Sequence, residues 1–151
     1  MRQRIRRQRR AFTLMEVLLV AGILALLAAF ALPALMNQAK KAKIKLAEAS
    51  VGRTGQIAKG LDFYRQDLGR YPETDEGLAA LYKAKDDRGD DDRYDGPYME
   101  GAFEELTDSW GNPFEYKCPG EFHENGYDLW SRGPDGVNDD GKEGSDDIKN
   151  W

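Results

Sequence analysis

The hydrophobic and polar positions divide this chain into an apolar N-terminal stretch and a mixed remainder. Residues 12–36 are polar only at Thr13 and Glu16. About 20 apolar residues span the hydrocarbon core of a bilayer, so the stretch predicts a transmembrane helix. A carboxylate near the start of such a helix costs a few kcal/mol. Glu16 is therefore expected to have a function of its own.

Beyond the apolar stretch, the pattern is that of an amphipathic helix. Apolar or small residues recur at spacings of three, four or seven: Ile44, Ala47, Val51, Thr54, Ala58, Leu61 and Leu68. This spacing predicts one helical face, so a single helix is expected to run from Phe12 to Leu68. Pro33 should kink it because proline lacks the N–H of the backbone ladder. Gly52, Gly55 and Gly60 weaken a helix by roughly 1 kcal/mol each, so packing must support its outer half.

Shorter elements are predicted after this helix. Gly69 and Pro72 end it, and residues 74–84 are expected to form a short second helix capped by Thr74. Three β signals follow, around residues 98–99, 114–118 and 127–131. Aromatic residues that can cover a small antiparallel sheet lie among them: Trp110, Phe114, Tyr116, Phe122, Tyr127 and Trp130. The pattern predicts an α+β fold in which a long N-terminal helix, transmembrane in one half and amphipathic in the other, packs on this sheet.

Charge is distributed unevenly along the 151 residues. Residues 1–11 contain six arginines and no acid, although the whole chain has a net charge of −5. The basic segment is read as a topological signal held on the cytoplasmic side of a membrane. The acidic remainder argues against a nucleic-acid partner. The single cysteine, Cys118, excludes an intrachain disulfide.

Two simpler interpretations of the N-terminus remain open. One is a secretory signal cleaved after its apolar region, near an Ala-x-Ala-like match at residues 29–31. The other is a plain anchor that is never cleaved. The predicted continuation of the helix past residue 36 argues against cleavage at residues 29–31.

Several motifs, in this order, resemble a known family. The first is Ala11-Phe12-Thr13-Leu14-Met15-Glu16 behind the basic leader; the others are Asp62–Pro72, Glu76–Leu81, Gly96–Tyr98, Asp108–Tyr116, Tyr127–Gly136 and Asp147–Trp151. Together they resemble the major pseudopilins of bacterial type II secretion systems, within the type IV pilin-like superfamily. The resemblance implies a leader at residues 1–11, a transmembrane and polymerisation helix at 12–36, and a periplasmic domain at 37–151.

The same resemblance assigns roles to residues near the N-terminus. A prepilin peptidase is expected to cut between Ala11 and Phe12, and Phe12 is expected to be N-methylated. Ala11 departs from the glycine that is usual before the cut. Glu16 is expected to pair with the new α-amine, of its own chain or of a neighbour, and so to set the stagger of packed helices; the alternative is a Glu that reaches headgroup water. Pro33 occupies another recurring position of the family and is counted with Glu16 as an assembly residue.

The tail, residues 135–147, has the chemistry of a calcium loop. Carboxylates and backbone carbonyls on a glycine-containing turn supply the oxygen ligands that Ca²⁺ requires. The EF-hand pattern does not fit, because Asp140 stands where that loop has glycine. The resemblance implies a structural calcium held by a set of side chains and carbonyls: Asp135, Asp146, Asp147, Ser145, and the backbone of Arg132 and Val137. An unliganded acidic tail is the alternative.

No arrangement of residues in the sequence predicts an enzyme. The only histidine, His123, lies in a turn-like stretch, and Cys118 has no second histidine to activate it. The expected protein is a single-pass subunit of the bacterial inner membrane, with a cytoplasmic N-terminus, that forms a periplasmic pseudopilus and drives export across the outer membrane. Expected partners are further copies of itself, minor pseudopilins, the inner-membrane assembly platform and the prepilin peptidase. The alternatives are a minor type IV pilin and a membrane-anchored calcium-binding module that forms no filament.

Overall fold

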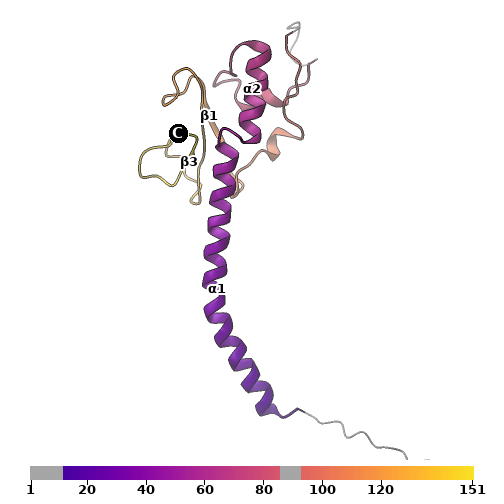
Figure 1. Ribbon diagram of the computed structural model, residues 1–151, viewed down its shortest axis with the longest axis vertical. Coiled ribbons are helices and arrows are strands. Elements are labelled where there is room, and N and C mark those ends of the chain that lie inside the picture. The colour runs from indigo at the N-terminus through magenta and orange to yellow at the C-terminus, as the bar shows by residue number, and fades with distance from the viewer. Residues whose placement is uncertain (1–11, 86–92) are drawn as a thin grey trace, which may run out of the picture. The chain divides into compact units, whose positions relative to one another are not determined.

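The computed structural model describes residues 12–85 and 93–151. The chain consists of two compact units, Met1–Lys40 and Lys41–Trp151. The order of the elements is α1 (Leu14–Val51), α2 (Gln56–Leu68), η1 (Leu78–Tyr82), η3 (Phe103–Glu105), β1 (Glu115–Lys117), β2 (Asp128–Ser131) and β3 (Ile148–Lys149) (Figure 1). A long N-terminal helix followed by a small antiparallel sheet confirms the predicted α+β class. The leader and the residue before the expected cleavage site lie outside the described residues.

The prediction of one helix from Phe12 to Leu68 is wrong between Val51 and Gln56, where α1 ends and α2 begins. Gly55 has the extended backbone angle ψ 163° instead of a helical one. A Cβ at this position would lie 2.5 Å from the carbonyl oxygen of Ser50. Only glycine permits so close an approach of two backbone segments. Of the three glycines expected to weaken the helix, Gly55 is therefore the one that the break between α1 and α2 requires.

The end of α2 matches its sequence signals, whereas the segment after it does not. Gly69 adopts the left-handed conformation (φ 76°), and its N–H donates to the carbonyl of Arg65, which is the usual glycine end of a helix. The expected helix at 74–84 is reduced to the short 3₁₀ helix η1, which begins after Gly77 without a side-chain cap. Thr74 is not its cap, because its hydroxyl donates to the carbonyl of Cys118 at 2.9 Å and accepts from the Cys118 N–H. A tertiary contact has replaced the local one.

The sheet has three antiparallel strands in the order β1-β2-β3. Two of the three predicted strands are present: Glu115 pairs with Trp130 in β1·β2, and β2 pairs in turn with β3 through Ser131 and Ile148. No strand forms at residues 98–99, whose N–H groups both donate to the carbonyl of Leu81. The third strand is β3 instead, which lies in the tail. Its two residues are too few for an alternation of hydrophobic and polar positions to predict a strand.

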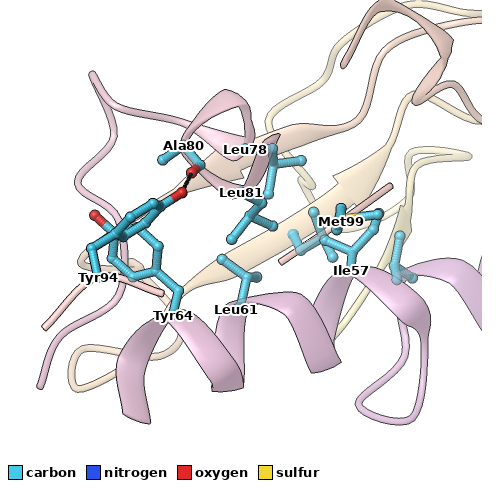
Figure 2. Packing of buried hydrophobic residues seen from close by; sticks show 10 residues of the cluster. Ile57, Leu61, Tyr64, Leu78, Ala80, Leu81, Tyr94 and Met99 are labelled. Atoms are coloured by element: carbon cyan, nitrogen blue, oxygen red, sulfur yellow. Dashed lines mark hydrogen bonds between the residues drawn. The ribbon is translucent and has the colours of Figure 1, made fainter. Parts of the chain in front are cut away.

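The core of the second unit forms where α2, η1 and β2 meet. Figure 2 shows Ile57, Leu61 and Tyr64 projecting from α2 toward the residues of η1 and Met99. The buried cluster consists of Val51, Ile57, Leu61, Tyr64, Leu78, Ala80, Leu81, Tyr94, Met99 and Leu129. Of the aromatic residues expected to cover the sheet, Trp130 is buried and Phe114, Tyr116 and Tyr127 are partly buried, but Phe122 is 54% exposed and stacks on Trp151. The cluster includes Leu129 of β2, and Ile148 of β3 packs against it, so its burial joins the sheet to α2.

Candidate functional site

The N-terminal end of α1 is closed by reciprocal hydrogen bonds between Thr13 and Glu16. The N–H and the hydroxyl of Thr13 donate to Glu16 Oε2 at 2.9 and 3.0 Å, and the Glu16 N–H donates to the Thr13 hydroxyl at 3.2 Å. This is a capping box, in which each residue satisfies an N–H that the helix leaves unpaired. The sequence signature of this box is Thr13-x-x-Glu16 before an apolar run, and the role predicted for Glu16 did not include it. Glu16 therefore has a partner within its own chain.

The side chains of α1 that follow this cap are largely exposed. In residues 12–36 every described side chain is exposed, including Phe12 at 83% and Phe30 at 81%. The helix is long and apolar enough to cross a membrane by its length and composition. A shallow groove of about 420 Å³ follows one face, lined by Phe12, Glu16, Val17, Val20, Ala21 and Leu24. α1 runs through Pro33, and the kink expected there stays a prediction.

The tail loop after β2 is held by carboxylates that accept backbone hydrogen bonds. Asp147 Oδ2 accepts from the N–H of Gly141 at 2.9 Å and of Asp139 at 3.3 Å. Asp146 Oδ2 accepts from the N–H of Asp135 at 3.2 Å, which brings two of the predicted ligand residues together. The loop is thus closed across eleven residues by its own acids.

Asp147 has one oxygen that the loop does not satisfy. The residue is only 7% exposed. Its Oδ1 is buried without a hydrogen-bond partner among the described residues. An unpaired buried polar atom costs about 1–3 kcal/mol, and more where it carries charge. A cation bound beside Oδ1 would remove that cost.

The remaining predicted ligands are placed less closely. The Ser145 hydroxyl donates to the Lys142 carbonyl at 2.8 Å, and the Arg132 guanidinium pairs with Glu115, so Arg132 can offer only its carbonyl. The Val137 N–H donates to Asp135 Oδ1 at 2.8 Å. Within residues 12–85 and 93–151, no three acidic, histidine or cysteine side chains are grouped to hold a metal. A calcium site here has to include hydroxyl and carbonyl oxygens, as the predicted ligand set does.

His123 and Cys118 both have structural contacts. His123 Nδ1 lies 2.9 Å from Oδ1 of the buried Asp128, whose carboxylate also accepts from the N–H groups of Phe122 and His123. The Cys118 thiol lies 3.4 Å from the carbonyl of Gly126. Burial raises the pKa of this thiol, which lowers its thiolate fraction and its reactivity. These contacts organise the turn before β2.

The sequence matches two family patterns. Residues 34–151 match the family described as "Type II secretion system (T2SS), protein G". The chain belongs to this family. Residues 6–32 match the prokaryotic N-terminal methylation motif, which covers the expected cleavage site and Glu16.

Individual relatives agree with this membership. The type II secretion system core protein G of Pseudomonas aeruginosa is 36% identical over 147 residues, which cover 97% of each chain. The protein of the same name from Escherichia coli K12 is 36% identical over 145 residues, or 95% of this chain and 92% of the relative. The crystal structure of the major pseudopilin from the type 2 secretion system of enterohaemorrhagic E. coli has a TM-score of 0.59 at 31% identity, covering 78% of this chain and 89% of that one. The resemblance inferred from the motifs is confirmed.

Family membership indicates the class of protein in which the residues of α1 and of the tail loop act. The protein is a pseudopilin of type II secretion, and its family is a structural one, not a family of enzymes. The methylation motif together with the apolar α1 fits a membrane-anchored pseudopilin. Two features of the pseudopilin therefore stand out as functional candidates: the capped, exposed start of α1 and the acidic tail loop.

Proposed function

We propose that this pseudopilin enters the bacterial inner membrane with its N-terminus in the cytoplasm and is cleaved between Ala11 and Phe12 by a prepilin peptidase. It then polymerises through α1 into a periplasmic pseudopilus that drives export of folded proteins across the outer membrane. The observation that carries this is the run of exposed apolar side chains at 12–36, which needs lipid or neighbouring helices around it. Minor pseudopilins and an inner-membrane assembly platform are the further partners we propose. The role is structural, without catalysis.

Glu16 has two tasks in this proposal. Before assembly it caps α1 through Thr13, which lowers the cost of a carboxylate in lipid by giving it hydrogen-bond donors. In the filament its charge pairs with the methylated amine of Phe12 in a neighbouring subunit. An attraction of this kind is strong where water is excluded, and it makes the correct helix stagger more stable than the others.

Two substitutions of Glu16 separate the capping of α1 from the pairing of charges in the filament. Glu16→Gln keeps a side-chain oxygen for the capping box but removes the charge, whereas Glu16→Ala removes both. Both variants should fractionate with the inner membrane, and both should yield few sheared filaments and few crosslinks between copies. Glu48→Ala, an exposed change later on α1, is the matched control and should assemble normally. Normal filaments from Glu16→Gln would show that capping suffices and would contradict charge pairing.

We also propose that the tail loop binds one structural Ca²⁺. Asp147 Oδ1, Asp135 and Asp146 are the carboxylate ligands proposed, completed by Ser145 and the carbonyls of Arg132 and Val137. The Oδ1 oxygen of Asp147 supports this proposal, because it is buried without a hydrogen-bond partner among the described residues and a cation beside it would satisfy it. A bound calcium would supply positive charge to the acids of this loop. Because only the folded loop gathers the ligands, binding would stabilise the fold by mass action, in place of a disulfide.

A further inference from the structure

The segment of α1 just beyond the apolar stretch carries positive charge without acids. Residues 17–47 contain no Asp or Glu, although the chain has 27 of them. Lys41, Lys43 and Lys45 lie on exposed positions of this segment, and we refer to these three as the lysine collar. None of their ammonium groups forms a hydrogen bond or ion pair within the described part of the chain. Elsewhere in the same unit, by contrast, Lys117 pairs with Glu121.

The lysine collar follows the end of the apolar stretch closely in the sequence. At a rise of 1.5 Å per residue, Lys41 follows Met36 by about 7.5 Å along α1, and Lys45 by about 13.5 Å. The headgroup layer on one side of a bilayer is roughly 5–7.5 Å thick. Helical side chains lean toward the N-terminus, and lysine stems extend along apolar surface while the charge stays in the polar layer. The ammonium groups therefore reach back to headgroup level when residues 12–36 span the membrane.

A second element of the same unit meets α1 at this level. The hydroxyl of Ser109 donates to the carbonyl of Lys43 at 2.9 Å, so the turn that contains Ser109 lies against the lysine collar. The next residue, Trp110, is half-buried, and tryptophan favours the interface between water and lipid. The acid of this turn, Asp108, is 7% exposed and accepts from the N–H groups of Trp110 and Asn112 and from a serine hydroxyl. The charge of Asp108 is therefore satisfied by hydrogen bonds within the unit.

We propose that the lysine collar, with Trp110 beside it, binds the headgroups of anionic phospholipid in the membrane leaflet that faces the folded unit. Charge complementarity carries the choice of partner, because the chain beyond residue 11 is acidic overall, whereas the lysine collar lies in a segment without acids directly after the apolar stretch. The inference rests on the proposed membrane placement of residues 12–36. It adds a step to assembly: a subunit that leaves the membrane must exchange these lipid contacts for contacts in the filament.

Lipid selectivity in vesicles tests the proposal. The full chain is reconstituted in phosphatidylcholine vesicles that contain roughly 30% phosphatidylglycerol, so that both lipids compete for contact with the protein. Spin-labelled phosphatidylglycerol and spin-labelled phosphatidylcholine then report the lipid in contact with the protein. The wild type should prefer phosphatidylglycerol by at least roughly fivefold at low salt, because a single lysine near an anionic surface already has an effect of this size. The preference should approach unity at about 0.5 M NaCl, where charges are screened within a few ångströms.

Matched variants assign the preference to the lysine collar. Lys41→Gln with Lys43→Gln should lower the preference at least twofold. Lys59→Gln with Lys83→Gln removes the same charge from two other exposed lysines, whose ammonium groups form no ion pair with the described residues, and should leave the preference unchanged. The basic leader is identical in all variants, so its own lipid contacts cancel. In a second measurement, interfacial spin label should quench the fluorescence of wild-type protein more than that of Trp110→Phe.

Different outcomes overturn different claims. Equal preference in the two double variants would overturn the proposal. A wild-type chain that floats with vesicles at alkaline pH but shows no selectivity would overturn the lysine collar and leave the membrane placement standing. A chain that fails to float would overturn both. Unchanged selectivity with lost crosslinking between copies in the collar variant would assign these lysines to a neighbouring subunit, and the lipid proposal would be wrong.

Discussion

Replacement of Asp147 by asparagine should change the stability of the pseudopilin in a way that depends on calcium. In wild type, Asp147 Oδ2 accepts from the N–H groups of Gly141 and Asp139, and Oδ1 is buried without a hydrogen-bond partner in the part of the chain that the structure describes. Asparagine keeps one oxygen for the two N–H groups and removes the buried charge. In chelator, Asp147→Asn should therefore lie within about 1 kcal/mol of wild type, since weaker hydrogen bonds are offset by the lost charge penalty.

Calcium should separate the two proteins. An ion present at 100 to 1,000 times its dissociation constant stabilises the form that binds it by about 2.7–4.1 kcal/mol. For a folded unit of this size, that corresponds to a rise of roughly 10 °C or more in melting temperature, at about 4 °C per kcal/mol. Wild type should show this rise between chelator and millimolar calcium, whereas Asp147→Asn should show little of it.

Thermal melts of the full chain in detergent, followed by near-ultraviolet circular dichroism, measure both effects. Asp75→Asn, an exposed acid outside the tail loop, is the matched control and should respond to calcium as wild type does. Magnesium, which requires tighter octahedral geometry, should stabilise less. The reasoning fails if wild type melts at the same temperature in chelator and in calcium, or if Asp147→Asn keeps the full calcium response.

Three further changes test the folded unit. Gly55→Ala should destabilise it by about 2 kcal/mol or more in urea unfolding, because the new Cβ would lie 2.5 Å from the Ser50 carbonyl oxygen; wild-type stability would refute the close approach. Leu61→Ala, at a fully buried position, should cost about 2–5 kcal/mol in the same assay, whereas Leu46→Ala, at a position 62% exposed, should cost under about 0.5 kcal/mol. Burial raises the pKa of Tyr127 to about 12, so this tyrosine ionises at a lower pH in the unfolded chain than in the folded one. Its contribution to the free energy of unfolding is complete below about pH 10 and should be lost as the pH rises from about 10 to about 12. An equally steep loss of stability in a Tyr127→Phe variant would contradict this.

Local chemistry accounts for the features that were predicted correctly. The apolar stretch, the helix end at Gly69 and the strands around Tyr116 and Leu129 each depend on short-range periodicity or on one turn residue. The capping box of Thr13 and Glu16 belongs to the same class, since both partners lie within one turn, and its four-residue signature could have been read from the sequence.

The missed features depend on partners far away in the chain. Thr74 had the chemistry of a helix cap, yet it bonds to Cys118, 44 residues on, because the fold brings the two segments together. The strand β3 is too short to be recognised and exists because β2 offers it a free edge. The unpaired oxygen of Asp147 is likewise a consequence of burial that no local pattern records.

The sequence by itself determined that this chain has a basic N-terminal segment, a span of apolar residues with one acid, and the ordered motifs of a pseudopilin, because hydrophobicity, charge and local motifs are carried by neighbouring residues. Tertiary structure alone decided where the long helix breaks, which strand completes the sheet, and which oxygen of the tail loop is buried without a hydrogen-bond partner among the described residues. Those outcomes depend on which distant segments compete for the same buried space and hydrogen bonds, and that competition is settled only when the whole unit packs.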